Sequence, residues 1–311
     1  MTTFLRSVWF RAGLTVAILA VLGTRIDMRA SGEALFAVDL RCLLLALVLV
    51  GLDRATMILR WVVLLKASGH QVSVKSAAWI HMVSSFVGSV LPAGVGADAT
   101  RAYTLSRRTA QTSEAVASVA VDRVVGVISI ATMGAIGLSI WSSTDSTAPQ
   151  GLAVPVAIGT LTLGICTLRA DWLTGWLLPT PWHSSRVGAA ILNLARVIAG
   201  YRERPATLVL VFLLSMTVQA LRILEAYVLG LGLGINVDLA YYLVFMPVGL
   251  LALLMPISVG GFGLPQGVFV WLLRPRGVPD PTSFALSTLI ILTGLAGTLP
   301  GAFLYARSKK T

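Results

Sequence analysis

Charged residues and cysteine are scarce in this sequence. Asp, Glu, Lys and Arg together make up 12% of the 311 residues, against roughly 25% in an ordinary soluble domain. A soluble exterior must be largely polar, so this scarcity excludes a cytosolic enzyme and a disordered chain. The only two cysteines, Cys42 and Cys166, lie inside apolar runs, which excludes a disulfide scaffold.

The motifs of common enzyme chemistries are also absent. The sequence has no G-x-x-x-x-G-K phosphate loop, no H-E-x-x-H and no G-x-S-x-G nucleophile elbow. Its three histidines, His70, His81 and His183, are spread along the chain, and no Cys/His cluster has the spacing of a metal site. We therefore expect neither enzyme activity nor a bound cofactor or metal ion.

Apolar residues, in contrast, are abundant and occur in long runs. They make up 56% of the chain, and the mean hydropathy is +0.86. A membrane-spanning helix needs about 20 mostly apolar residues, and helices are expected because hydrocarbon cannot satisfy an open backbone. The pattern predicts an all-α, polytopic membrane protein, with apolar segments at residues 8–24, 41–65, 76–91, 118–141, 152–168, 205–233, 239–255, 259–273 and 283–305.

Two of the apolar regions are interrupted by proline and glycine. Residues 84–101 read SSFVGSVLPAGVGADATR, and residues 250–266 read LLALLMPISVGGFGLPQ. Proline breaks a helix, and glycine permits a tight reversal. The shared P-x-x-V-G pattern indicates corresponding breaks in two halves, which is typical of transporter binding sites; two ordinary proline kinks are the alternative. We expect the hairpins to be shaped by Pro92, Gly94, Gly96, Pro256, Gly260, Gly261 and Gly263.

The distribution of basic residues predicts the orientation in the membrane. If both broken regions are re-entrant hairpins, about six full spans remain, and both termini lie on one face. Most Lys and Arg outside the spans then fall on that face, and the other face receives Arg25, Arg29, Arg41, Arg274 and Arg276. Because basic loops stay in the cytoplasm, we expect an inverted repeat in the plasma (bacterial inner) membrane with both termini cytoplasmic.

The longest stretch outside the spans is 169–204. Within it, apolar residues from Val187 to Tyr201 recur at helical spacing, which predicts an amphipathic helix on the cytoplasmic membrane surface. Its role is a structural link or, alternatively, lipid recruitment. We expect a single transmembrane domain, 1–311, in which this linker joins a first half, 1–168, to a second half, 205–311.

Opposite charges occur together within or beside the predicted spans. An intramembrane charge costs at least about 2.5 kcal/mol at a helix centre on insertion scales, so these residues are candidates for function. A structural ion pair is the alternative for any one pair, but several pairs beside two helix breaks favour a polar pathway. The candidate substrate-binding residues are Arg101, Arg123, Arg222, Asp98, Asp122, Glu225, His81, Arg60 and Asp53.

The spacing of these charges predicts which of them face each other. Arg222 and Glu225 are three residues apart, as are Asp98 and Arg101, which is close enough to pair on one helix face. Asp122, adjacent to Arg123, lies in a stripe of small and polar residues with Ser118, Gly126 and Ser129. Such a face is unsuited to lipid tails, so we expect it to face the bundle interior. Asp53 and Arg60 share a helix face across two turns.

Arginine binds phosphate through bidentate hydrogen bonds and keeps its charge, and half-helix N-termini add backbone N–H donors. We therefore expect an anionic or phosphate-bearing membrane phospholipid as partner. We expect three arginines to bind the phosphate: Arg101, Arg123 and Arg222. Three carboxylates, those of Asp98, Asp122 and Glu225, are expected to position these arginines. The net charge of +11 fits basic loops and anionic lipid, not nucleic acid.

The residues leave two alternative functions open. One is a non-transporting membrane scaffold or subunit for a separate cell-envelope lipid enzyme or glycosyltransferase. The other is an ion-coupled carrier of a soluble anion. The oligomeric state, a homo-oligomer included, is also left open, as are the lipid, the direction and the energy source of any transport.

The order of these motifs resembles the transmembrane region of lysylphosphatidylglycerol synthases, also called the flippase-like domain family. Residues 86–108, with Leu91-Pro92, Gly96, Asp98 and Arg101, resemble its first motif. Asp122-Arg123 followed by Gly126 resembles its DR-x-x-G element, and Pro256 to Gly263 resembles its P-x-x-x-G-G-x-G element. The resemblance implies paired re-entrant helices that move lipids between leaflets.

This sequence departs from the family pattern in two ways. The namesake carries a soluble synthase domain, which we do not expect in a chain that ends at Thr311, so no aminoacyl transfer is expected. In addition, Leu264-Pro265-Gln266 stands where the family commonly has charged residues after the glycines. The second departure bears on headgroup contacts in the second hairpin.

Overall fold

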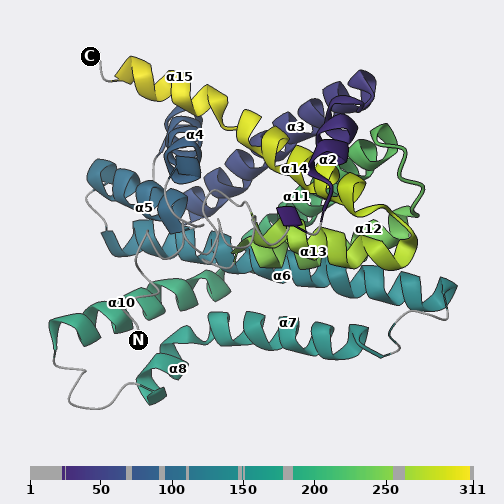
Figure 1. Ribbon diagram of the computed structural model, residues 1–311. Helices are drawn as coiled ribbons and strands as arrows, with labels where there is room; N and C mark the ends of the chain where they lie inside the picture. Colours follow the sequence, from purple (N-terminus) through teal and green to yellow (C-terminus); the bar gives the residue numbers. More distant parts are fainter. Residues whose placement is uncertain are drawn as a thin grey trace.

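The computed structural model describes residues 23–24, 26–67, 72–90, 95–109, 112–145, 149, 151–177, 185–254 and 263–308. Throughout these residues the regular structure is helical (Figure 1). Within these residues, four segments are long and apolar enough to cross a membrane: Leu40–Ala67 (α3), Thr112–Thr144 (α6), Pro205–Gly232 (α11) and Asp280–Arg307. The bent pair Ala153–Leu168 and Ala170–Leu177 would be a fifth if it forms one span. The prediction of an all-α, polytopic membrane protein is confirmed, whereas the number of spans and the inverted repeat stay predictions.

The predicted apolar segments from 41–65 onward coincide with helices, with bounds that differ by up to six residues where the structure describes them. Segment 152–168 forms α7, Ala153–Leu168. Segment 283–305 forms α14 (Asp280–Ala296) and α15 (Leu299–Ser308), which are separated at Gly297. A Cβ on Gly297 would lie 2.5 Å from Cγ1 of Val50, so glycine is what lets this turn lie against α3. The predicted first span, 8–24, lies almost wholly outside the described residues.

Each predicted hairpin corresponds to a pair of packed helices. α4 (Val74–Val90) packs against α5 (Val95–Thr109), and α12 (Leu239–Leu254) packs against α13 (Leu264–Leu273). A Cβ on Gly88 would lie 2.6 Å from the backbone nitrogen of Ala97, so a side chain there would force α4 and α5 apart. The turning segments, with the predicted hairpin-shaping residues Pro92, Gly94, Pro256, Gly260 and Gly261, lie outside the described residues.

The core lies between α3, α11 and α12. α3 packs along α11, and α6 packs against α12 (Figure 1). A buried cluster of large side chains, including Tyr242, Phe245 and Phe269, joins α12 to α13. α7 lies along the outer side of α6 and exposes apolar side chains such as Ile158 and Leu161. Exposed apolar side chains on a spanning helix are those that contact lipid in a membrane protein.

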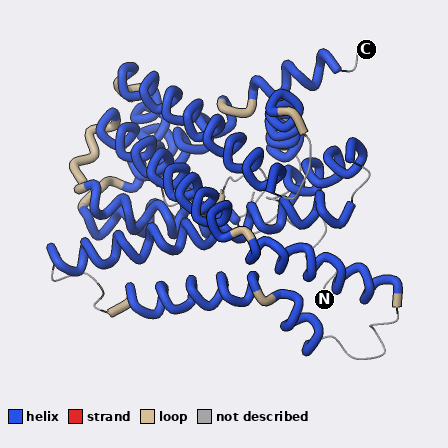
Figure 2. Tube along the Cα trace, turned by 180° about the vertical axis from the view of Figure 1, so that it is seen from behind, coloured by secondary structure: helices blue, strands red, loops and turns tan. Residues whose placement is uncertain are grey.

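The described residues of the linker, 169–177 and 185–204, form two α-helices, where the sequence predicted one. α8 (Ala170–Leu177) is bent by 81° from α7, and α10 (Arg186–Gly200) packs against α6 and α8 (Figures 1 and 2). α10 confirms the predicted helix between Val187 and Tyr201. A 3₁₀ turn, η1 (Tyr201–Glu203), follows it, and Arg202 in this turn forms an ion pair with Asp171 of α8 at 3.0 Å.

Two arginines fall on the face that was expected to be poor in basic residues. They lie in a 3₁₀ turn, η2 (Arg274–Arg276), which follows α13. Arg274 pairs with Asp280, and Nη1 of Arg276 lies 2.9 Å from Oδ2 of Asp145 at the end of α6. Both arginines therefore have an aspartate partner, and the side of the membrane on which they lie stays a prediction.

One further helix was not anticipated. α2 (Met28–Phe36) packs against α14. Asp27 caps its start, since the Asp27 side chain accepts hydrogen bonds from the backbone N–H groups of Arg29 and Ala30. This is the usual action of an N-cap residue.

Candidate functional site

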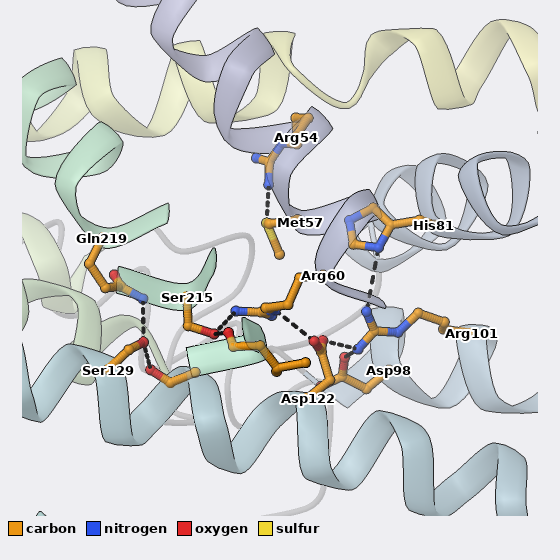
Figure 3. Close-up of polar contacts among 12 residues, drawn as sticks. Arg54, Met57, Arg60, His81, Asp98, Arg101, Asp122, Ser129, Ser215 and Gln219 are labelled. Carbon is orange, nitrogen blue, oxygen red and sulfur yellow. Dashed lines mark hydrogen bonds and ion pairs between the residues drawn. The ribbon is translucent and has the colours of Figure 1, made fainter. Parts of the chain in front are cut away.

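Asp122 on α6 is the centre of a buried ion-pair network. Its Oδ1 accepts a hydrogen bond from Nε of Arg60 on α3 at 2.7 Å, and its Oδ2 accepts one from Nη2 of Arg101 on α5 at 2.9 Å. All three side chains are at most 6% exposed. Figure 3 shows the two guanidinium groups converging on this carboxylate. One carboxylate therefore joins three helices through charge-assisted hydrogen bonds, which offset the cost of burying the charges.

Arg101 has three further neighbours. Its Nη2 lies 3.2 Å from Oδ1 of Asp98, so the pair expected from their spacing is present. Its Nη1 lies 3.4 Å from Nδ1 of His81 on α4, and its guanidinium lies over the ring of Trp61 at 5.1 Å. A guanidinium only donates hydrogen bonds, so Nδ1 of His81 is the acceptor and the imidazole proton is on Nε2.

Arg123 turns away from its neighbour Asp122. Its Nε lies 3.5 Å from Oδ2 of Asp98, and its side chain is 42% exposed. The adjacency of Asp122 and Arg123 in the sequence does not make them a pair, because adjacent helical residues project about 100° apart. The stripe containing Ser118, Asp122 and Ser129 does face the interior as predicted, since all three are buried.

A second charged group joins α3, α11 and α14. Nε of Arg222 on α11 lies 3.0 Å from Oδ1 of Asp53, and Nη1 of Arg54 lies 3.5 Å from Oδ2 of Asp53. Nη2 of Arg54 donates a hydrogen bond to the carbonyl of Gly294 at 3.1 Å. This group corrects one expectation: the sequence predicted that Arg222 pairs with Glu225, whereas Arg222 binds Asp53 and Glu225 lies 2.6 Å from Oγ1 of Thr293. Spacing brings two residues to one helix face, but the close packing of α3 on α11 offers Arg222 a nearer carboxylate.

Both groups line one cavity of about 350 Å³. Helices α3, α4, α5, α6, α11, α12 and α14 contribute to its wall. All nine candidate residues identified from the sequence line it, together with Arg54. Its charged lining comprises five arginines, at positions 54, 60, 101, 123 and 222, and four carboxylates, at positions 53, 98, 122 and 225. When all the carboxylates are ionised, the lining therefore keeps an excess of positive charge, which favours an anionic ligand.

Several buried polar atoms of the residues that line the cavity have no hydrogen-bond partner in the described part of the chain. They are Nε of Arg54, Nε2 of His81, Oγ of Ser84, Nε of Arg101 and Oε1 of Gln219. A buried polar group left unpaired costs about 1–3 kcal/mol. Most of these atoms are donors, so an anion that reached them would recover part of that cost.

Comparison with known families decides the relationship of the chain. A family model described as the lysylphosphatidylglycerol synthase TM region matches residues 8–301. The chain belongs to this family. None of the curated proteins matches the chain.

The motif residues of this lysylphosphatidylglycerol synthase TM region come together in the cavity. Asp98 and Arg101, from the first motif, and Asp122, Arg123 and Gly126, from the DR-x-x-G element, all line it. Gly126 lies beside Arg60, since a Cβ built on it would be 3.9 Å from Nη1 of Arg60, an ordinary van der Waals contact. The motif thus places charged groups from two helices on one wall.

Two of the predicted hairpin-shaping glycines, Gly96 and Gly263, lie among the described residues, and each stands at or near the beginning of a helix. The carbonyl of Gly96 accepts a hydrogen bond from the Thr100 hydroxyl in the first turn of α5. Gly263, with a φ of +102°, precedes α13, and its backbone N–H donates to Oε1 of Gln266 at 2.6 Å. Gln266 is fully buried. The residue that departs from the charged family pattern therefore caps a helix, and it is absent from the lining of the cavity.

Sequence reasoning missed four polar residues of the site. Arg54, which lies within the predicted segment 41–65, was not among the candidate residues. Ser215 accepts a hydrogen bond from Nη1 of Arg60 at 3.0 Å, Gln219 donates to Oγ of Ser129 at 3.2 Å, and Thr293 contacts Glu225. A polar stripe in segment 205–233, formed by residues 215, 219, 222 and 225, was the available signal for the first two of these contacts.

Proposed function

We propose that this multi-pass membrane protein moves a phospholipid, or another lipid with a phosphate-bearing headgroup, between the leaflets of the bacterial inner membrane. The observation that supports this most directly is the convergence of five arginines on one cavity within the helical bundle. Intramembrane arginines are costly, so a cluster of them around a cavity is explained best by an anion that passes through it. The proposal requires neither an ATPase nor a synthase domain.

The arginines divide into two kinds in this proposal. Arg60 and Arg101 are held by Asp122 and are almost fully buried. Arg123 and Arg222 are more exposed, with 42% and 23% of their side chains accessible. The accessible pair can contact a phosphate directly, because their guanidinium groups keep free donors, while Asp122 holds the inner pair in place.

The size of the cavity supports a headgroup, not a whole lipid, as its occupant. At about 350 Å³ it lies at the small end of the range for ligand sites, which is about 300–1,000 Å³. The acyl chains would therefore stay outside the bundle. An apolar groove between α2, α3 and α14 lies beside the site, and Thr293 lines this groove while its hydroxyl contacts Glu225 of the cavity. This neighbouring groove favours a lipid over a soluble anion.

Reconstituted vesicles provide the test. Purified protein in phosphatidylcholine vesicles with a trace of fluorescent phosphatidylglycerol should speed the exposure of inner-leaflet label to an added membrane-impermeant quencher. We expect Arg222→Ala to slow this movement strongly. Arg107→Ala, which removes an exposed arginine on α5, is the matched control and should behave as wild type. Equal rates for protein-free vesicles and wild type would contradict the proposal and favour a non-transporting scaffold.

Orientation is tested separately. The proposal places both termini in the cytoplasm, because basic loops are retained there. A cysteine introduced at Thr311 in a chain with Cys42 and Cys166 replaced by serine should react with an impermeant thiol reagent in inverted membrane vesicles. Reaction in intact spheroplasts instead would reverse the orientation.

A further inference from the structure

Glu225 differs from the other carboxylates of the cavity. Asp53, Asp98 and Asp122 each have an arginine nitrogen within 3.2 Å, whereas Glu225 forms no ion pair with any residue in the described ranges. Glu225 is only 6% exposed, and its Oε1 lies 2.6 Å from Oγ1 of Thr293. Within a membrane, an unpaired buried carboxylate is neutralised more readily than it is kept charged.

The hydrogen bonds of Thr293 are independent evidence that the Glu225 carboxyl is protonated. Oγ1 of Thr293 lies 2.8 Å from the carbonyl oxygen of Leu289 and 3.1 Å from that of Ile290, in addition to its contact with Glu225. A hydroxyl carries a single proton. An ionised Glu225 would compete with these carbonyls for it. A protonated Glu225 instead donates its own proton to Oγ1, and the hydroxyl remains free to donate to the α14 backbone.

The charged groups that face Glu225 do not neutralise a negative charge on its carboxylate. They are Asp53 and Arg54 on α3 and Arg222 on α11, its own helix. Asp53 repels a second negative charge, and both arginines are engaged with Asp53. α14 offers Thr293, and the neighbouring carbonyl of Gly294 is taken by Arg54. α12 contributes Met246, Leu250 and Leu253 to the cavity, and all three are apolar.

We propose that Glu225 is a proton-binding site linked to the anion site of the same cavity, so that a proton is taken up when a phosphate headgroup binds. This inference rests on the proposed function only in requiring an anionic ligand. With Glu225 neutral, five arginines face three carboxylates in the lining. When Glu225 ionises, its carboxylate attracts Arg54 and Arg222. These two arginines then bind the anionic ligand less strongly. Anion binding and protonation therefore favour each other, and this linkage is reciprocal.

Calorimetry measures the linkage directly. Short-chain dihexanoyl phosphatidylglycerol is titrated into the full chain in detergent, in buffers with different ionisation enthalpies, over a range of pH. For wild type we expect proton uptake in the pH interval between the titration of Glu225 in the free protein and its titration in the complex, and an affinity that falls across this interval by up to about tenfold per pH unit. Glu225→Gln, which imitates the protonated carboxyl, should bind without proton uptake and with an affinity independent of pH. Glu225→Asp is the second variant, and it should retain proton uptake.

Two controls separate Glu225 from other titrating groups. Glu203→Gln removes an exposed carboxylate in η1 and should leave proton uptake unchanged. His81→Gln removes the imidazole that also lines the cavity, and the pH dependence due to Glu225 should persist. Glycerol 1-phosphate, titrated in place of the lipid, shows whether the headgroup alone drives proton uptake or whether acyl chains are needed.

The outcomes are distinct for the two proposals. Binding of phosphatidylglycerol without proton uptake by wild type, or uptake that persists in Glu225→Gln, overturns the proton site and leaves the proposed function standing. If neither lipid nor glycerol phosphate binds, the anion site itself fails. Infrared spectroscopy then decides the proton site alone: the carbonyl stretch of a protonated carboxyl at neutral pH, present in wild type and lost in Glu225→Gln, supports it, and its absence from wild type overturns it.

Discussion

Arg60 on α3 and Asp122 on α6 form an ion pair with 2.7 Å between Nε and Oδ1, and both side chains are almost completely buried. The same carboxylate also accepts a hydrogen bond from Arg101 on α5. Without this partner Arg60 would be a buried charge with no carboxylate, and Arg101 would keep only the longer, 3.2 Å contact with Asp98; moving an unpaired charge out of water costs several kcal/mol. Asp122 is therefore the residue on which the arrangement of three helices around the cavity depends.

The first prediction concerns the stability of this network. Asp122→Asn should lower the free energy of unfolding by about 3–5 kcal/mol, because it leaves the buried Arg60 without a carboxylate and Arg101 with Asp98 alone. The additional change Arg60→Met should restore part of the loss, since it removes one of the uncompensated charges. Steric trapping or thermal denaturation in detergent measures both variants. A double variant no more stable than Asp122→Asn would contradict a direct coupling of these two residues.

The second prediction concerns the packing of the first hairpin. Gly88→Leu should destabilise the protein and abolish lipid movement, because even a Cβ at this position would overlap the backbone of Ala97. Gly51→Ala on α3 is the matched control, since a Cβ there meets nothing within 4 Å. Because alanine favours helix over glycine by roughly 1 kcal/mol, the control should be neutral or stabilising. Thermal denaturation and the vesicle assay provide the measurements.

The third prediction concerns Arg276 in η2. Its guanidinium pairs with Asp145 and lies over the rings of Trp141 and Tyr241 at 5.0 and 4.4 Å. Arg276→Lys keeps the charge but loses the planar stacking surface, and we expect a loss of about 1 kcal/mol in unfolding free energy. Arg274→Ala, which removes an exposed arginine nearby, should leave the unfolding midpoint unchanged. Equal effects at both positions would argue against a role for ring stacking.

The fourth prediction concerns α8 and the membrane surface. Trp172 and Trp176 are exposed, and their rings stack with centroids 6.4 Å apart. Tryptophan side chains of this kind gather at membrane interfaces, where an apolar ring and a polar N–H are both satisfied. Lipids brominated near the headgroup should quench protein fluorescence more than lipids brominated at the chain end, and Trp172→Phe with Trp176→Phe should reduce this difference. An unchanged difference would place α8 away from the interface.

The membrane class, the helix positions and the residues of the cavity followed from the sequence. Apolar runs of about 20 residues have few stable forms other than helices in hydrocarbon, so α3, α6 and α11 lie where they were predicted. The nine candidate residues were found for a related reason: a charge within an apolar helix is too costly to face lipid, and the bundle interior is the remaining place for it. Their convergence on one cavity follows from this exclusion.

The pairing of these charges was decided by tertiary structure alone. Arg222 binds Asp53, 169 positions away in the chain, instead of Glu225 on its own helix, because the packing of α3 on α11 determines which carboxylate lies within reach. The same packing leaves Glu225 beside Thr293 of α14 and gives Gln266 the role of a helix cap. Local spacing fixes which face of a helix a side chain occupies, whereas its partner comes from whichever helix is packed against that face.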